Sequence, residues 1–335
     1  MSKESIIQQA EKYLQAGKYD KAIKEYQRLL AEDPSDMRAK LKLGDIYARK
    51  KEIPVAIATY REVALEYEKD SFHLKAIAVY KTILKLSPTL VEINEKLADL
   101  YHQVGLDQDA MNQYHIVLSV YDAKGRAKEV LEIRKKIASM NPENTSARIR
   151  LAESYQANGN VEEALQEYEQ VAHLLETRQE WDSLIEVYEK MLYYRPQNTD
   201  RLAKLCRIYF EKRDFKKALR RIDASPLEVK NDPVITELWA EALLEDRQTD
   251  ASRRKFKDLY ASLLESGETE SSVRIYSRIL QEFSDDDDYL KEVEEIRTSA
   301  GLEPSQKPVT PQHRQDFERT EMIDLSKMEE MMKKK

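Results

Sequence analysis

The sequence predicts an all-α protein made of repeated helices, and three observations support this prediction. Gly and Pro are scarce, at 7 and 10 of 335 residues, and the chain is rich in the helix formers Ala, Leu, Glu, Lys and Arg. Four prolines recur at a constant interval of 54 residues, at Pro34, Pro88, Pro142 and Pro196. A motif of a large apolar residue, a small residue and a tyrosine recurs at the same interval. The chain therefore contains an internal repeat, and the repeat determines the fold.

The four prolines mark equivalent helix ends. Each follows an apolar stretch, such as Leu-Lys-Leu-Ser before Pro88. Proline has no N–H to donate and biases the residue before it away from helical backbone angles. We therefore expect one helix to end just before each of these prolines.

Small residues and tyrosines mark the faces on which the helices pack. The first set is Leu43-Gly44, Leu97-Ala98, Leu151-Ala152 and Leu205-Cys206, followed on the next turn by Tyr47, Tyr101, Tyr155 and Tyr209. The second set places an aromatic residue four positions after an alanine, at Ala22 and Tyr26, Ala56 and Tyr60, Ala76 and Tyr80, Ala110 and Tyr114, and Ala164 and Tyr168. Residues at these spacings share a helix face, and a small side chain lets a second helix approach closely.

The spacing of the second set defines the repeating unit. Equivalent positions fall at 22, 56, 76, 110, 130, 164, 184, 218, 252 and 272, mostly in alternating steps of 34 and 20 residues. Each 20-residue step adds one helix, so the unit has three helices in 54 residues. The middle helix, for example residues 53–69, would then be the second helix of one pair and the first of the next.

The first copy of this pattern resembles the tetratricopeptide repeat. Its matching residues are Ala10, Tyr13, Gly17, Tyr19, Ala22, Tyr26 and Pro34. Residues 37–70, 91–124, 145–178 and 199–232 fit the same 34-residue pattern with varying completeness, so the resemblance extends over most of residues 3–283. It implies a right-handed α-solenoid of tetratricopeptide-like helical hairpins that acts as a protein-interaction scaffold.

The regularity of the array is interrupted at two places. After Ala218 the expected 20-residue step is missing, and Pro226 and Pro233 fall within a short polar stretch. We therefore expect a solenoid over 3–223, a second helical-repeat segment over 224–300, and a linker with a charged, Met-rich tail over 301–335.

Charge and composition narrow the class of protein. A net charge of -7 gives no general attraction to nucleic acid or anionic lipid. The single Cys206 cannot form an internal disulfide, the first residues lack the order of a signal peptide, and no stretch of about 18 uncharged apolar residues exists. We expect a cytoplasmic protein without membrane insertion.

No catalytic, metal or cofactor site is predicted. The Asp285–Asp288 run lacks the Gly and Glu of a calcium loop, and it suits the N-terminus of a helix. The five histidines are scattered along the sequence, which does not suit a zinc site. With only seven glycines, the chain has no glycine-rich phosphate-binding loop. We therefore expect a protein that is not an enzyme and needs no cofactor.

The resemblance also implies a binding groove lined by the first helix of each pair. On the matching positions of this chain, the groove would contain Asp45, Asp99, His102, Glu153, Gln156, Arg207 and Phe210. Such a row of varied side chains suits an extended or helical segment of a partner. The alternative is that these are ordinary solvent-facing residues.

A basic cluster lies just before the interruption of the array. It consists of Lys212, Arg213, Lys216, Lys217, Arg220 and Arg221. The simpler interpretation is a solvated helix face. The alternative is a docking patch for an acidic partner or phosphate, because six cations within ten residues exceed what solubility requires.

The tail carries apolar residues at near-helical spacing. These are Phe317, Met322, Leu325, Met328 and Met332, with charged residues between them. One interpretation is an amphipathic helix that docks into a groove of a partner or of this protein, and the other is a disordered, solubilising tail.

The sequence thus favours a non-catalytic scaffold or adaptor whose partners are proteins or peptides. Two alternatives remain at this stage. One is a structural protein that self-associates by stacking its terminal helices. The other is a regulatory module that binds an acidic or nucleic-acid ligand at residues 212–221, although the net charge argues against nucleic acid.

Overall fold

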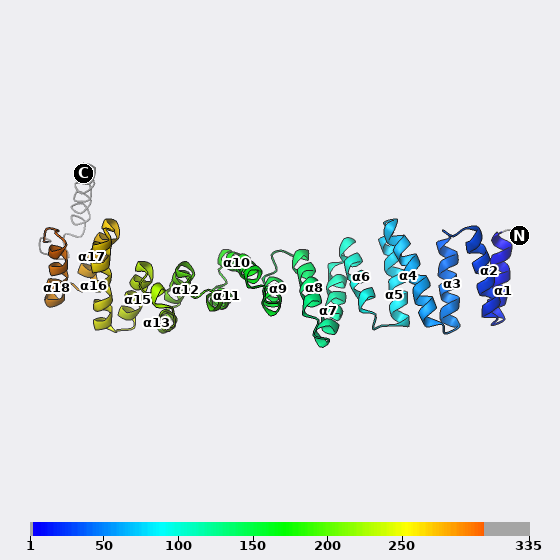
Figure 1. Ribbon diagram of the computed structural model, residues 1–335, viewed down its shortest axis with the longest axis horizontal. Helices are drawn as coiled ribbons and strands as arrows, with labels where there is room; N and C mark the ends of the chain where they lie inside the picture. The colour runs from blue at the N-terminus through cyan, green and yellow to red at the C-terminus, as the bar shows by residue number, and fades with distance from the viewer. Residues whose placement is uncertain (1–2, 305–335) are drawn as a thin grey trace, which may run out of the picture. The chain divides into compact units, whose positions relative to one another are not determined.

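The computed structural model describes residues 3–304, and every regular element in this range is an α-helix (Figure 1). The predicted all-α repeat fold is therefore confirmed. The chain divides between Gln179 and Glu180 into two compact units.

The helices of the first unit are α1 (Lys3–Gln15), α2 (Tyr19–Glu32), α3 (Met37–Arg49), α4 (Ile53–Lys69), α5 (His73–Leu86), α6 (Val91–Gln103), α7 (Asp107–Ala123), α8 (Ala127–Met140), α9 (Thr145–Ala157) and α10 (Val161–Arg178). Those of the second unit are α11 (Trp181–Tyr194), α12 (Thr199–Glu211), α13 (Phe215–Asp223), α14 (Leu227–Lys230), α15 (Pro233–Glu245), α16 (Thr249–Ser266), α17 (Thr269–Glu282) and α18 (Asp287–Ser299).

Equivalent helices begin at a constant interval. The helices α3, α6, α9 and α12 start at residues 37, 91, 145 and 199, which is one start every 54 residues. Within the first unit, α4 packs against both α3 and α5, and α7 packs against both α6 and α8. Each middle helix therefore belongs to two neighbouring helix pairs.

The same local chemistry begins and ends these helices. Before α3, α9 and α12, the side chains of Asp36, Asn144 and Asn198 accept the N–H of the residue three positions on, at 3.0, 3.0 and 2.9 Å. After α3, α6, α9 and α12, one residue adopts a left-handed conformation, at Lys51, Gly105, Gly159 and Arg213. These stop positions are also 54 residues apart, so the repeat extends to the caps.

The predicted packing faces form the core. In the pairs of the second set, from Ala22 and Tyr26 to Ala164 and Tyr168, every alanine and every tyrosine is buried. Gly44 shows why a small residue is needed, because a Cβ atom there would lie 2.8 Å from Cε1 of Tyr60 on α4. The helices thus approach one another over the small residues, as the sequence predicts.

The expected boundary at residue 224 lies inside the second unit of the structure. Pro226 precedes the short helix α14, and Pro233 is the first residue of α15. Because α13 packs directly on α15, and Ile222 and Val229 are buried beside this segment, the core continues through it. The two prolines lie on either side of the one-turn helix α14, and the first compact unit of the structure ends at residue 179.

Ion pairs join alternate helices in the second unit. Both terminal nitrogens of Arg274 on α17 donate to the carboxylate of Glu237 on α15, at 2.6 and 2.7 Å. Arg278, one turn further along α17, pairs with Glu241. Glu237 is buried, so this two-point contact fixes the position of α17 against α15.

Candidate functional site

Two carboxylates of the predicted groove already bind tyrosines of this protein. The Tyr60 hydroxyl donates to Asp45 and the Tyr114 hydroxyl donates to Asp99, each at 2.5 Å. Burial raises the pKa of Tyr60 and of Tyr114, and these hydrogen bonds raise it further. Both phenols therefore stay protonated and join the second helix of a hairpin to the first.

Asp99 has a second partner on a third helix. Lys136 on α8 lies 3.0 Å from both oxygens of Asp99 and 2.8 Å from Glu95. Burial lowers the pKa of Lys136, but its hydrogen bonds to Glu95 and Asp99 outweigh this effect and raise the pKa overall. Asp99 thus belongs to a network that joins α6, α7 and α8, which is a structural role.

The other predicted groove residues of the first unit are His102, Glu153 and Gln156. His102 Nδ1 lies 2.7 Å from Oδ1 of Asp107. Gln156 lies 3.5 Å from the hydroxyl of Tyr168, and Glu153 is exposed. The use of this row to bind a partner stays a prediction.

Arg207 and Phe210 lie on α12 of the second unit. Arg207 is exposed. Phe210 makes an edge-to-face contact with Phe215, with ring centroids 5.3 Å apart. Because these two residues belong to a different unit from Asp45, Asp99, His102, Glu153 and Gln156, each set is a separate candidate surface.

The basic cluster divides into paired and unpaired cations. Lys212 pairs with Asp182 at 2.7 Å, Lys217 with Asp214 at 2.7 Å and Arg221 with Glu189 at 3.0 Å. Arg213, Lys216 and Arg220 are exposed and make no ion pair within residues 3–304. Half of the cluster is therefore neutralised by the protein's own carboxylates, which reduces its attraction for a polyanion.

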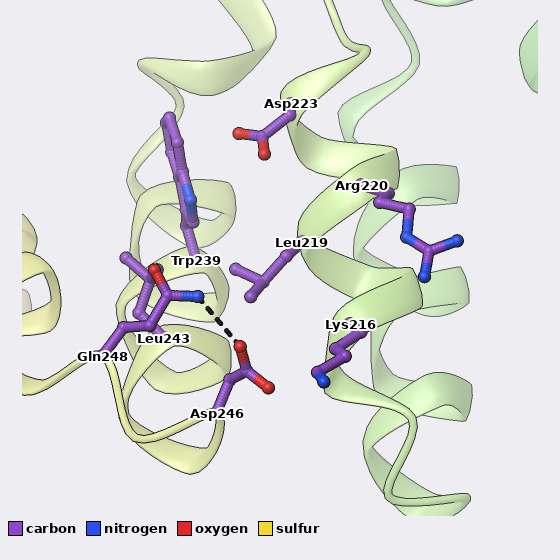
Figure 2. Close-up of a pocket in the computed structure, with 8 residues that line it drawn as sticks. All are labelled: Lys216, Leu219, Arg220, Asp223, Trp239, Leu243, Asp246 and Gln248. Carbon is purple, nitrogen blue, oxygen red and sulfur yellow. Dashed lines mark hydrogen bonds between the residues drawn. The ribbon is translucent and has the colours of Figure 1, made fainter.

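The unpaired cations Lys216 and Arg220 line a groove between α13 and α15 (Figure 2). Its apolar floor consists of Leu219, which points from α13 toward α15, together with Leu243 and Trp239 on α15. Lys255 on α16 lies 3.7 Å from the centroid of the Trp239 ring. This cation–π contact holds the indole in place as one wall of the groove.

The rim of the groove carries charges of both signs. Lys216 and Asp246 lie at one end, and Asp223 lies at the other, near Trp239 (Figure 2). Gln248 donates to Asp246 at 2.9 Å. Arg220 points away from Trp239 and forms the outer side of the groove (Figure 2).

The size of the groove limits what it can hold. Its volume is about 230 Å³, below the range of about 300–1,000 Å³ typical of small-molecule and cofactor sites. It therefore suits one or two side chains of a bound polypeptide, with an apolar side chain against Trp239 and a charged one at the rim.

Sequence reasoning identified the cations of this groove but not its floor. The i, i+4 spacing of Leu219 and Asp223, and of Trp239 and Leu243, was the available signal. What the sequence did not reveal is that α13 and α15 pack directly on each other across the two prolines. The predicted tail residues Phe317, Met322, Leu325, Met328 and Met332 lie outside the described residues.

Three further observations concern the acidic run, metal binding and membrane insertion. Asp286 accepts the N–H of Tyr289 at 3.1 Å at the start of α18 and pairs with Arg253 at 2.6 Å, which is the capping role expected for the acidic run. Within residues 3–304, no group of three His, Cys, Asp or Glu side chains is arranged to hold a metal ion. In the same range, no helix combines the length and apolarity needed to cross a membrane.

The tetratricopeptide repeat model matches the sequence twice, over residues 7–72 and 123–187. The chain contains tetratricopeptide repeats. A comparison with curated proteins finds no match. These findings agree with the resemblance seen in the first copy of the repeat.

Solved structures of other tetratricopeptide repeat proteins are similar at low identity. A tetratricopeptide repeat protein from Parabacteroides merdae is 16% identical over 76% of this chain and 91% of its own, with a TM-score of 0.23. The TPR2AB domain of yeast Sti1, solved in a complex with pHSP90, is 13% identical over 89% of this chain and 98% of its own, with a TM-score of 0.26. At such identities and scores, the assignment to the family rests on the sequence match.

Proposed function

We propose that this tetratricopeptide repeat protein is a non-catalytic scaffold that binds segments of other proteins, and that the groove between α13 and α15 is one of its binding sites. The observation that supports this most directly is the combination of an apolar floor with unpaired cations on the rim. Trp239, Leu219 and Leu243 offer an apolar surface for one side chain, and Lys216 and Arg220 offer charge to its neighbours. The ligand that fits is a short peptide with one apolar anchor residue and acidic residues directed at Lys216 and Arg220.

The cytoplasm is the proposed location, since the single Cys206 is buried and forms no disulfide. The groove-lining row of the first unit is a second proposed contact surface. It consists of Asp45, Asp99, His102, Glu153 and Gln156, and Asp45 and Asp99 would have to accept additional hydrogen bonds there besides those from Tyr60 and Tyr114.

The test uses the full chain and two synthetic ten-residue peptides that share a central leucine. One peptide has glutamates on both sides of the leucine, and the other has lysines. The chain has two tryptophans, so Trp181→Phe leaves Trp239 as the only indole and its fluorescence reports on the groove. We expect the acidic peptide to change this fluorescence in a salt-sensitive manner and the basic peptide to leave it unchanged.

A pair of charge-reversal variants provides the control. Lys216→Glu with Arg220→Glu should weaken binding of the acidic peptide by about tenfold or more, which corresponds to about 1.4 kcal/mol. Lys217→Glu makes the same kind of change on the same helix at a cation already paired with Asp214, and it should have a much smaller effect. Equal binding of both peptides, or equal effects of the two sets of variants, would contradict the proposed site.

A further inference from the structure

A second and larger groove lies between α16 and α18. Its volume is about 680 Å³, and it is separate from the groove between α13 and α15. The apolar residues that line it are Ala261 and Leu264 from α16, and Ile296 and Ala300 from α18 and the residue after it. All four are at least partly exposed within residues 3–304, so this apolar strip has no complete cover from that part of the chain.

The rim of this groove is acidic. Glu265, Glu292 and Glu295 line it together with one cation, Lys257, which pairs with Glu292 at 2.6 Å. Glu265 and Glu295 are exposed and make no ion pair within the described residues. An occupant that fits must therefore combine an apolar face with positive charge.

Residues 325–335 of the same chain have this combination. On a helix of 3.6 residues per turn, Leu325, Met328 and Met332 would share one face, with Met331 at one edge of it and Glu329 at the other, while Glu330 would lie on the opposite side. Lys333, Lys334 and Lys335 follow directly. Methionine side chains adapt to irregular apolar surfaces, which suits a strip lined by alanine, leucine and isoleucine.

The dimensions of the groove and the tether also agree. The groove follows α18 from Glu292 to Ala300, a rise of about 12 Å, and a helix from Leu325 to Met332 would rise about 10.5 Å. The chain between Pro304 and Leu325 is 20 residues long, and a random-coil chain of that length has an average span of about 25 Å. This exceeds the length of α18, about 20 Å, so the segment can return to the groove at an effective concentration in the millimolar range.

We propose that the groove between α16 and α18 binds residues 325–335 of the same chain as an amphipathic helix. The methionines pack on Leu264 and Ile296, and the lysines pair with Glu265 and Glu295. In this arrangement the tail covers the apolar strip at the end of the array. This proposal is independent of the peptide site between α13 and α15.

The experiment measures hydrogen exchange of residues 325–332 in the full chain at two protein concentrations, with sedimentation to establish the molecular mass. We expect slowing of about tenfold or more relative to an unstructured peptide of the same sequence, equal at both concentrations. Glu265→Lys with Glu295→Lys should remove most of this protection. Adding Lys333→Glu, Lys334→Glu and Lys335→Glu to that variant should restore it, because the charges are then exchanged between groove and tail.

Matched controls separate docking from a general effect of charge. Glu268→Lys with Glu270→Lys makes the same change of charge in the same unit at exposed residues outside the groove, and it should leave the protection in place. Absence of protection in the unmodified chain would overturn the proposal. Protection that falls on dilution would overturn it in favour of a second copy of the chain, and protection that the Glu265 and Glu295 variants do not change would exclude this groove.

Discussion

Replacing Gly44 with alanine should destabilise the first helical pairs, although alanine is the better helix former. Gly44 lies within α3 and faces the ring of Tyr60 on α4. A Cβ atom there would lie 2.8 Å from Cε1 and 3.0 Å from Cδ1 and Cζ of that ring, so the ring has to move. Tyr60 is buried and its hydroxyl donates to Asp45 at 2.5 Å, so the movement also weakens a hydrogen bond.

The opposing contributions can be compared. Alanine in place of glycine stabilises a helix interior by about 1 kcal/mol. Overpacking costs about 1–3 kcal/mol, and a weakened hydrogen bond about 1 kcal/mol more. We expect a net loss of about 1–3 kcal/mol for Gly44→Ala, because the two costs together exceed the helix-propensity gain.

The assay is native-state hydrogen exchange of the amides of α3 and α4, since a repeat array does not unfold as one cooperative unit. The decisive comparison is with Tyr60→Leu, which removes the ring. In that background, Gly44→Ala should become stabilising by about 1 kcal/mol, so the sign of its effect reverses. The control Ala98→Gly, at the equivalent position of α6, should destabilise by loss of helix propensity and packing. Stabilisation by Gly44→Ala in the unmodified chain would refute this reasoning.

Three other predictions concern single residues. Burial raises the pKa of the Cys206 thiol to about 12, so iodoacetamide at pH 8 should leave it unmodified in the folded protein and alkylate it in urea, as mass spectrometry can show. Arg213→Gly should stabilise the α12–α13 turn by up to about 1 kcal/mol in a urea titration, because Arg213 has a positive φ, whereas Arg213→Ala should not. Burial raises the pKa of Asp36, but its hydrogen bond with Lys3 and the backbone N–H of α3 lower it overall. Because the pKa of Asp36 is lower in the folded state, ionised Asp36 stabilises the protein above the unfolded pKa of about 3.9, and this stability is lost as the pH falls through the folded pKa. Hydrogen exchange in α1 and α3 should therefore accelerate as the pH falls below about 3.9. Asp36→Asn should remove this pH dependence.

Much of the fold could be predicted because the repeated residues are types that end helices or form their packing faces. Prolines and left-handed positions end helices, and alanines four residues before tyrosines define the buried faces. The hydrogen bond from Tyr60 to Asp45 could not be predicted, because it depends on the direction of two side chains on different helices. Asp45 and Asp99, which were predicted as partner-binding residues, each accept a hydrogen bond from a buried tyrosine of the following helix, and their use by a partner stays a prediction.

The candidate site was predicted less completely than the fold. The unpaired cations Lys216 and Arg220 were among the six basic residues of the predicted cluster, but most of the floor of their groove comes from α15, beyond Pro226 and Pro233. A sequence with two prolines in a polar stretch is compatible both with a linker between domains and with a tight turn whose neighbours are buried. Burial of Ile222 and Val229 distinguishes the two cases, and burial is known only when the partner helix has been placed.

The constant interval between caps and stop positions has a consequence for how this array can change. Residues 36, 144 and 198 cap helices, and residues 51, 105, 159 and 213 end them, always at multiples of 54 positions. An in-frame duplication or deletion of 54 residues at any point between them places each buried position against an equivalent neighbour. The protein can therefore be lengthened or shortened by recombination between its own repeats without the loss of a cap or a packing face.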